Sequence, residues 1–447
     1  MASNSFSTPL DVIVGGGVSG LTAAARLARS GVPSVIIERS PHLGGFCRSL
    51  VLDDVVFDQG PHMFFPGMGG PGENLIQELL ADEEVFRLPG RYAIHADGRL
   101  WTFPPQFKDI LGYPLSYQLD ILKAFFRKKK PLHLQKTVWE SVAAKSGQKL
   151  YDKVVGPMMR SKTLHEGTEV HADWARKVDR TVRNIKEPPH KRPRPPSFLR
   201  RLKQPQADCF YPKGGFQRIP DLLWADYQKN GGEALLETTI GSINREGKRV
   251  QSVTLVDGRE IPVKNLIWTA NVNSLSALLG SQVEKLTYIK TILVFLTYDQ
   301  PENKTRPFNY VYYPDDHLLF NRLYLPRNLY GPSEPAGKEG VCAEITYTTG
   351  LDEQSDQEII DRIIQDIDGL GLFPKSSLRK TGIMRLGDCM PIYPIDYEEQ
   401  LAGFYREIHE LENLYAVGRM GGYYFCMTPA AINQGLKMAQ HLTDSSP

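Results

Sequence analysis

Asp11-Val-Ile-Val-Gly15-Gly-Gly17-Val-Ser-Gly20 joins a short apolar run to spaced glycines near the start of the chain. The apolar run predicts a buried strand, and the alanine-rich residues 20–28 predict a helix after it. In a dinucleotide-binding βαβ unit the first glycine permits the tight turn. The second lets the backbone approach a pyrophosphate, and the third lets the helix pack closely on the strand. The stretch therefore predicts a Rossmann-type fold.

An acidic residue completes this unit. Ser34 to Glu38 predicts the second strand, and Glu38 follows Gly20 by 18 residues. At the end of that strand its carboxylate can accept hydrogen bonds from both ribose hydroxyls, while the helix N-terminus offers free N–H groups to the phosphates. The alternative is a tight turn with a purely structural role. The expected cofactor contacts of this unit are Gly15, Gly17, Val18, Ser19, Gly20, Glu38 and Arg39.

Size and composition suit a soluble globular protein with two interleaved domains. The chain has 447 residues, 41% hydrophobic and 23% charged, and single cores stop growing near ~250–300 residues. Residues 1–9 lack the features of a signal peptide and no apolar run could span a membrane, so we expect a cytoplasmic protein without a transmembrane segment. The five cysteines are scattered without a Cys-x-x-Cys pair, so we expect neither disulfides nor a metal site. We also expect no nucleic-acid partner.

Charge is distributed unevenly along the chain. Residues 127–203 contain 21 Lys/Arg and 7 Asp/Glu, whereas the remainder contains 32 and 44. Such a basic segment favours an anionic substrate, a partner or a membrane surface, and the alternative is a solvated helical face. Residues 187–197 are rich in proline and predict a long loop.

The order of predicted elements indicates an α/β protein with an α+β substrate domain. Residues 72–180 predict a helical insertion, with helices at 73–80, 117–126 and 139–155. Strands are expected at 233–243, 250–256, 265–268, 288–298 and 310–313, and a last helix at 429–442 with Thr428 as N-cap. We predict a discontinuous cofactor domain at 1–75, 205–280 and 400–447. The substrate domain, with a mixed or antiparallel sheet, is predicted at 76–204 and 281–399.

A second glycine-rich element distinguishes FAD from NAD. Pro41-His-Leu-Gly44-Gly45-Phe-Cys-Arg48-Ser49 resembles the Gly-Gly-x-x-Arg-Ser/Thr element of the FAD-dependent amine oxidase, protoporphyrinogen oxidase and phytoene desaturase superfamily, to which UDP-galactopyranose mutase is related. The resemblance implies non-covalent FAD whose pyrophosphate contacts Gly45, Arg48 and Ser49. Phe57-Asp-Gln-Gly60-Pro61-His62 resembles the family's segment beside the isoalloxazine ring.

Later segments extend the resemblance over most of the chain. Tyr211-Pro-Lys-Gly-Gly-Phe216 is similar to the family's second cofactor segment, and Thr238-Thr-Ile240 matches the strand whose backbone meets the adenine. Leu414-Tyr-Ala-Val-Gly418-Arg419 resembles the closing motif that reaches the flavin. The last helix would then begin beside the ring, with its positive end near Met427 and Thr428 favouring negative charge on reduced flavin.

Substrate-side candidates are expected from several segments. Lys290 lies in an apolar strand, where the resemblance implies a lysine that holds water against flavin N5; the alternative is a strand-edge lysine that reaches solvent. Arg322 and Arg419 could bind a phosphate or carboxylate with their guanidinium groups, or form ion pairs that close the domain interface. His62 could face the flavin or be an interior histidine. The remaining candidates are Tyr393 and Tyr423.

Two reactions fit this set. In the first, the flavin takes a hydride from a small molecule, as in oxidases and desaturases. In the second, reduced flavin attacks a sugar nucleotide as a nucleophile, as in UDP-galactopyranose mutase. Asn321-Arg322 resembles the mutase, but Lys162-Thr-Leu-His165 lacks the tryptophan of the mutase's Lys-x-Trp-Gly. We therefore expect an oxidoreductase, with a mutase-like isomerase as the alternative. Substrate and oligomeric state do not follow from the sequence.

Overall fold

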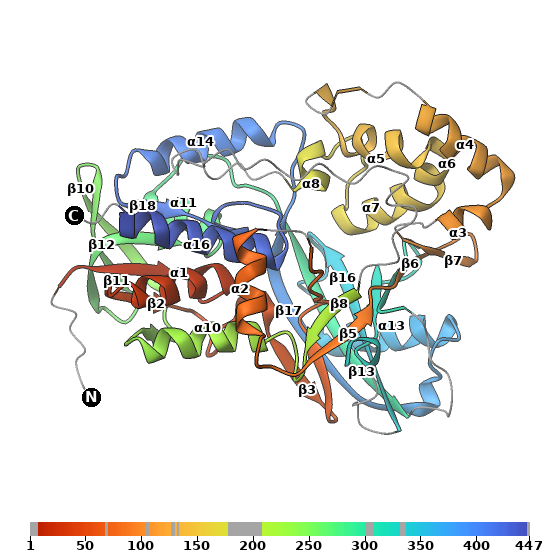
Figure 1. Ribbon diagram of the computed structural model, residues 1–447, viewed down its shortest axis with the longest axis horizontal. Coiled ribbons are helices and arrows are strands. Elements are labelled where there is room, and N and C mark those ends of the chain that lie inside the picture. Colours follow the sequence, from red (N-terminus) through yellow and green to blue (C-terminus); the bar gives the residue numbers. More distant parts are fainter. Residues whose placement is uncertain are drawn as a thin grey trace.

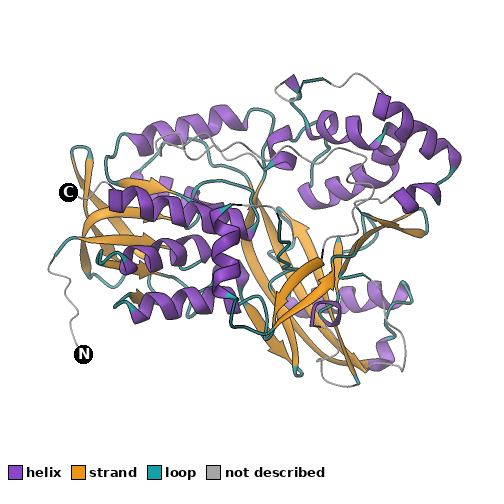
Figure 2. Ribbon diagram, viewed as in Figure 1, coloured by secondary structure: helices purple, strands orange, loops and turns teal. Residues whose placement is uncertain are grey.

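The computed structural model describes residues 8–67, 70–103, 107–126, 130–131, 134–177, 208–299, 308–330 and 337–444. These residues form two mixed sheets and a helical lobe (Figures 1 and 2). The sheets confirm the predicted fold class, a Rossmann-like domain combined with a substrate-domain sheet. The basic, proline-rich stretch 187–197 lies outside the described residues.

The first sheet has a parallel core in the order β9-β2-β1-β12-β18. The strand β12 is long enough to pair with β1 in its second half and with the antiparallel hairpin β10–β11 in its first half. Its strands are β1 (Leu10–Val14), β2 (Ser34–Ile37), β9 (Glu233–Leu235), β10 (Ile240–Glu246), β11 (Arg249–Leu255), β12 (Glu260–Trp268) and β18 (Leu414–Ala416).

Three helices lie side by side against this sheet: α1 (Val18–Arg29) lies between α10 (Arg218–Lys229) and α16 (Thr428–Asp444) (Figure 1). Small residues allow the close approach. A Cβ at Gly20 would lie 2.1 Å from the carbonyl oxygen of Gly15, and one at Gly435 would lie 2.4 Å from that of Ser19. The start of α1 is thereby held between the glycine loop and α16.

The second sheet has the order β17-β13-β16-β15-β14-β6-β7, in which only β14 and β6 pair in parallel. Both faces of β13 are buried: alternate residues such as Ile292 and Val294 pack with helix α13 (Asp356–Gly369), while Leu293 and Phe295 pack toward the cofactor domain. The strands are β6 (Tyr92–Ala96), β7 (Arg99–Thr102), β13 (Tyr288–Asp299), β14 (Tyr310–Tyr312), β15 (Arg322–Tyr324), β16 (Lys338–Tyr347) and β17 (Leu378–Pro391).

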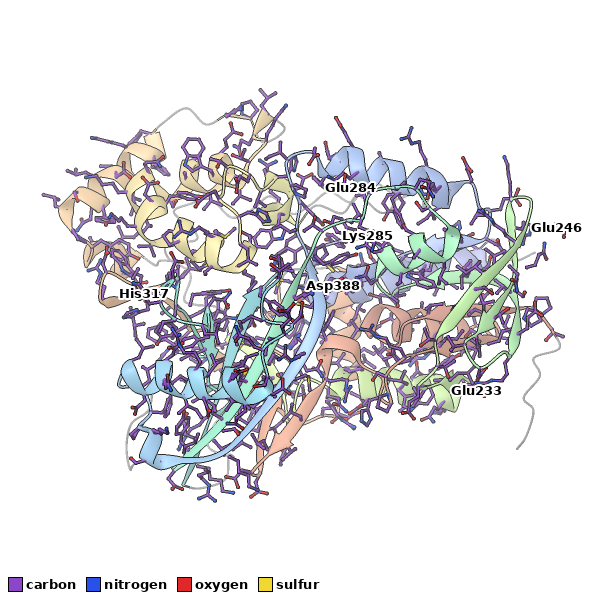
Figure 3. All side chains as sticks on the ribbon, turned by 180° about the vertical axis from the view of Figure 1, so that it is seen from behind. Glu233, Glu246, Glu284, Lys285, His317 and Asp388 are labelled. Atoms are coloured by element: carbon purple, nitrogen blue, oxygen red, sulfur yellow. The ribbon has the colours of Figure 1, made fainter. Side chains whose placement is uncertain are left out.

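Two hairpin-like pairs and the remaining helices connect these sheets. The pairs are β3 (Ser49–Leu52) with β4 (Val55–Asp58), and β5 (Val85–Pro89) with β8 (Asp208–Pro212). Asn271, which caps α11, donates a hydrogen bond of 3.0 Å to Asp388 of β17, where that strand reaches the cofactor domain (Figure 3). The helices here are α2 (Pro71–Leu79), α11 (Val272–Leu279), α12 (Arg327–Tyr330), α14 (Tyr397–His409) and α15 (Gly418–Gly421).

The helical lobe projects from one end of the second sheet (Figure 1). It contains α3 (Phe107–Leu111), α4 (Leu115–Phe126), α5 (Val138–Ser146), α6 (Gln148–Leu150), a π-helical turn (Tyr151–Val155), α7 (Gly156–Thr163) and α8 (Ala172–Arg176). The helix predicted at 139–155 is interrupted because Gly147 adopts φ 85°.

Two further expectations need correction. Residues 72–180 are not purely helical, since β5, β6 and β7 lie within them and two of these strands complete the second sheet. The strand predicted at 233–243 is two strands, β9 and β10, which lie at opposite edges of the first sheet. Between them Glu237 adopts φ 50°, which redirects the chain.

Candidate functional site

In the glycine loop between β1 and α1, the space beside Gly15 is filled by other residues, whereas the space beside Gly17 is open. A Cβ at Gly15, which has φ 104°, would lie 2.5 Å from the Oγ1 of Thr269. A Cβ at Gly17 would meet only the Cα of Gly45, at 3.9 Å. The backbone of Gly17 is therefore accessible to a ligand, and its neighbours Val18 and Ser19 begin α1, whose first N–H groups can face an anion.

Glu38 lies at the end of β2, beside this loop. Its carboxylate accepts hydrogen bonds from the backbone N–H of Gly16 at 2.7 Å and of Ser40 at 2.9 Å. The backbone N–H of Thr238 donates to the carbonyl oxygen of Glu38 at 3.0 Å, so the segment leading to the buried Ile240 runs alongside. The side chain of Arg39 is exposed. Because both carboxylate oxygens of Glu38 are held in place by backbone N–H groups, they can accept hydrogen bonds from the ribose hydroxyls of a nucleotide.

The second glycine pair contacts the first loop directly. The N–H of Gly44 donates to the carbonyl oxygen of Gly16 at 2.8 Å, and a Cβ at Gly45 would lie 3.0 Å from the Cα of Gly17. Arg48 follows, and its buried Nε has no hydrogen-bond partner among the described residues. Burial lowers the pKa of this guanidinium, against the opposing effect of Glu38. A half-buried cation beside an open glycine loop fits the pyrophosphate of a dinucleotide.

Ser49, which is expected to contact a phosphate, has its hydroxyl engaged within the chain. Its hydroxyl donates to the carboxylate of Asp58 at 2.6 Å and accepts from the N–H of Gln217 at 3.2 Å. The same carboxylate accepts from the Tyr211 hydroxyl at 2.8 Å and the Phe216 N–H at 3.1 Å. Burial raises the pKa of Asp58 to about 6, although these hydrogen bonds oppose the rise. Ser49 thus joins the β3–β4 hairpin to the segment 211–217.

The closing motif meets the loop at the start of α1. Gly418 adopts φ 85°, and a Cβ there would lie 2.9 Å from the Oγ of Ser19. That hydroxyl donates to the carbonyl oxygen of Ala431 in the first turns of α16, at 2.9 Å. Thr428 lies 3.8 Å from the Sγ of Cys47. The half-buried start of α16 at Met427 and Thr428 therefore lies beside the second glycine pair, where the positive end of the helix dipole suits an anion.

A buried ion pair lies on the face of the second sheet. Arg322 of β15 donates to its cross-strand neighbour Glu344 of β16, and both side chains are almost completely buried. The guanidinium carbon lies 5.4 Å from the ring centroid of Tyr310 and 5.5 Å from that of Tyr312. Burial raises the pKa of Glu344, but the charges of Arg322 and Lys162 outweigh it, so the net pKa lies below its usual value. The pair is ionised, and both of its partners come from neighbouring strands of the second sheet.

His62 lies between this ion pair and the cofactor segment. A Cβ at Gly60 would lie 3.5 Å from a carboxylate oxygen of Glu344, and Pro61 leads to the imidazole, which stacks on Phe216 at 5.1 Å. Burial lowers the pKa of His62 to about 4, and the charges of Arg419 and Arg322 add to this. The ring is therefore neutral at neutral pH. Its Nδ1 lies 3.0 Å from the carbonyl oxygen of Gly60, so Nδ1 carries the hydrogen and Nε2 is free to accept one.

Two lysines that sequence reasoning missed lie in the same region. The Nζ of Lys162, from α7, lies 5.7 Å from the ring centroid of Tyr312, and the Nζ of Lys177, which caps α8, lies 5.5 Å from that of Phe425. The guanidinium carbon of Arg419 lies 5.2 Å from the Phe425 ring. Burial, then the charges of Lys162 and Arg419, lower the pKa of Lys177 to about 8. For Lys177 the basic composition of residues 127–203 was the only signal, whereas Lys162 also stands in the segment compared with the mutase's Lys-x-Trp-Gly.

We define the cation cluster as Lys162, Lys177, Arg322 and Arg419. Among the described residues only Arg322 of this cluster forms an ion pair, with Glu344. The Nε atoms of Arg322 and Arg419 and the Oδ1 of Asn321 are buried without a hydrogen-bond partner in the described part of the chain. Such an excess of positive charge in a buried region suits a bound anion.

Three predicted site residues are engaged elsewhere. Lys290 has the same strand parity as Ile292 and so points toward the α13 side, where its Nζ pairs with Asp352 at 2.6 Å. The hydroxyl of Tyr393 donates to the Tyr423 carbonyl at 3.0 Å and accepts from the Phe425 N–H at 2.8 Å. The hydroxyl of Tyr423 donates to backbone carbonyls, including that of Thr287 at 2.8 Å. In this arrangement Lys290 is held in an ion pair on the α13 side, and the hydroxyls of both tyrosines are hydrogen-bonded to backbone groups.

Other kinds of site are not found in the described residues. All five cysteines are buried and form no disulfide within the described residues. Burial raises the pKa of Cys389 to about 11, and its thiol donates a hydrogen bond to the Thr291 hydroxyl at 3.0 Å. No group of three or more metal-ligating side chains occurs in the part of the chain that the structure describes. Within that part, no helix combines the length and apolar character needed to cross a membrane.

Comparison with protein families gives two matches. Residues 13–81 match the NAD(P)-binding Rossmann-like domain, and residues 196–443 match the flavin-containing amine oxidoreductases. The phytoene desaturase of Phycomyces blakesleeanus is 24% identical over 285 residues, 58% of this chain and 48% of that protein. The protoporphyrinogen oxidase of Bos taurus is 32% identical over 111 residues, 22% of this chain and 23% of that protein. The chain spans about half the length of the desaturases it matches.

Solved structures resemble nearly the whole chain. Reduced UDP-galactopyranose mutase has a TM-score of 0.77 at 17% identity, covering 98% of this chain and 96% of that one. A putative protoporphyrinogen oxidase from Exiguobacterium sp. 255-15 has a TM-score of 0.76 at 16% identity, covering 99% of this chain and 100% of that one. At these identities the likeness shows the fold alone.

Proposed function

The chain belongs to the flavin-containing amine oxidoreductase family, and from this premise we propose that it is an FAD-dependent oxidoreductase that oxidises an anionic small molecule. The observation that carries the anionic substrate is the cation cluster, in which only Arg322 has an ion-pair partner among the described residues. Bound flavin would supply hydride acceptance at N5. The residues of this chain would bind and orient the cofactor and substrate and exclude water.

Cofactor binding is assigned to the residues around the glycine loop. The open backbone at Gly17 and the unpaired Nε of Arg48 would receive the pyrophosphate, and Glu38 the ribose. Gly60 and His62 would lie toward the ring, with neutral His62 able to accept a hydrogen bond at Nε2. Arg419 and Lys177 would hold the anionic group of the substrate, since neither has an ion-pair partner among the described residues.

A mutase-like isomerase is the second candidate, because the cation cluster would also suit a diphosphate. The position of the expected tryptophan weighs against it. Leu164 stands there, in the left-handed conformation with φ 59°, and its side chain is exposed rather than placed to stack on a base. The oxidoreductase is therefore the better supported function.

Anaerobic reduction distinguishes these functions. We expect anionic candidate substrates to bleach the flavin absorbance of the purified protein without any added reductant. A mutase would instead need dithionite or NAD(P)H first and would then convert a sugar nucleotide without consuming reductant. Turnover of this second kind would overturn the oxidoreductase.

The pH dependence of substrate capture tests Lys177. Its pKa of about 8 means that the ammonium, which attracts the anion, is lost as pH rises through that value. We expect kcat/KM to be level below this pH and to fall about tenfold per pH unit above it. Burial is the main cause of this lowered pKa; the charges of Lys162 and Arg419 lower it further, and Cys426 and Tyr312 oppose them.

Two variants make this test specific. Lys177→Arg should move the alkaline fall beyond the accessible range, because arginine keeps its charge. Lys177→Met should give a low kcat/KM at all pH values without the fall. If the methionine variant retains the wild-type profile, another group is responsible.

A further inference from the structure

Asn321 carries a buried hydrogen-bond acceptor that the proposed binding of an anion does not use. Its amide nitrogen donates to the carbonyl oxygen of Ser161 and to the hydroxyl of Thr346, both at 2.6 Å. A carbonyl oxygen can only accept, so the contact with Ser161 fixes which end of the amide is the nitrogen. The residue is 9% exposed, and its Oδ1 is buried without a hydrogen-bond partner among the described residues.

This acceptor lies at the edge of the cation cluster. Arg322 pairs with Glu344 of β16, and Thr346 stands two residues further along that strand. Alternate residues of a strand share a face, so the side chains of Asn321 and Arg322 reach the same face of the sheet although they are neighbours in sequence. The amide also joins this face to α7, the helix that carries Lys162 and packs against β16 (Figure 1).

A neutral acceptor beside cations selects a ligand by two properties. A buried acceptor without a donor costs free energy, and a ligand that supplies the donor removes this cost, whereas an analogue without the donor leaves it in place. The charge of the donor matters as well. Lys162, Lys177 and Arg419 form no ion pair within the described part of the chain, so they repel an ammonium group. The donor that fits is therefore an uncharged O–H or N–H.

We infer that Asn321 is a specificity-determining residue, which selects an anionic substrate with an uncharged hydroxyl or N–H group beside its anionic group and excludes cationic amines. This role of Asn321 rests on the proposed function, in which the cation cluster binds the substrate. It also separates this chain from the description of its family as amine oxidoreductases, because a protonated amine would meet unpaired cations here.

Three anions with the same carbon skeleton test this role by their binding to the FAD-loaded protein at neutral pH. Malate adds one hydroxyl to succinate, and aspartate adds an ammonium group instead. Isothermal titration calorimetry should show that malate binds about tenfold more tightly than succinate, and that aspartate binds more weakly than either. This readout needs no turnover, so it is independent of the flavin-reduction test of the oxidoreductase.

Variants assign the preference to the amide. Asn321→Leu removes the acceptor, so it should bind malate and succinate equally. If this variant does not fold, Asn321→Thr takes its place, because the threonine hydroxyl can donate to the Ser161 carbonyl while its shorter side chain draws that oxygen away from the ligand. Thr346→Val is the matched control. It deletes one hydrogen bond of Asn321 and leaves Oδ1 in place, so the preference for malate should remain.

Equal binding of malate and succinate to the wild type would overturn the role of Asn321, as would a preference that survives in Asn321→Leu. Aspartate that binds as tightly as malate would overturn the exclusion of cationic amines. If none of the three anions binds, the cation cluster is not an anion site and the role of Asn321 fails with it. Flavin bleaching by an anionic substrate, combined with equal binding of malate and succinate, would keep the oxidoreductase and reject only the role of Asn321.

Discussion

Replacing Gly17 with valine leaves a folded protein that has lost its flavin. Gly17 has φ −74° and ψ 176°, which valine also adopts, and a Cβ there meets no described atom closer than 3.9 Å. The protein itself therefore tolerates the side chain. It would stand where the pyrophosphate must approach, so flavin content should fall about tenfold or more. The measurement is the flavin absorbance per protein, with FAD identified after denaturation.

Gly369→Val provides the matched control for this change. Gly369 ends α13, and nothing lies within 4 Å of a Cβ built there. This variant should be yellow and release FAD like the wild type. A Gly17→Val protein with full flavin content would show that the loop is only a structural turn. A wild type that cannot be loaded with FAD would end the cofactor assignment.

Replacing Arg322 with methionine should destabilise the protein by about 3–5 kcal/mol, because it leaves the carboxylate of Glu344 buried without its partner. The midpoint of denaturant unfolding, followed by tryptophan fluorescence, would report the loss. The double variant Arg322→Met/Glu344→Gln should recover much of it, since the uncompensated charge is gone.

Arg419→Met separates stability from substrate binding. Arg419 makes no ion pair among the described residues, so its loss should leave the unfolding midpoint nearly unchanged and raise KM for an anionic substrate. Arg322→Met with wild-type stability would show that the Arg322–Glu344 pair is not structural. Arg419→Met with unchanged KM would remove Arg419 from the proposed substrate site.

The fold and the cofactor loop could be predicted because their signals are local. Gly15, Gly17 and Gly20 all lie at a single strand-to-helix turn, and the apolar run before them forms a single buried strand. The hydrogen bonds of Ser49 could not be predicted, because its partners, Asp58 and Gln217, come from two other segments.

The substrate side depends on tertiary contacts that no short motif encodes. Lys162 and Lys177 come from the helical lobe and Glu344 from a central strand, and only the fold brings them together. Lys290 lies in the expected strand, but its side chain is on the face of the sheet that packs against α13. The sequence could not show which face that is, because the strand is apolar on both faces.

The interleaving of the two sheets constrains how a ligand can enter. The chain crosses between them after β4, after β8, after α11 and after β17, so the halves are joined at several separate places. Rotation of one half as a rigid body would require all these connections to turn about a single axis. We therefore expect the sheets to keep their relative orientation during turnover. Access to the cation cluster would then depend on shifts of α7 and α8, the helical-lobe elements that carry Lys162 and Lys177, so a crosslink between the sheets should slow catalysis less than one that fixes the lobe.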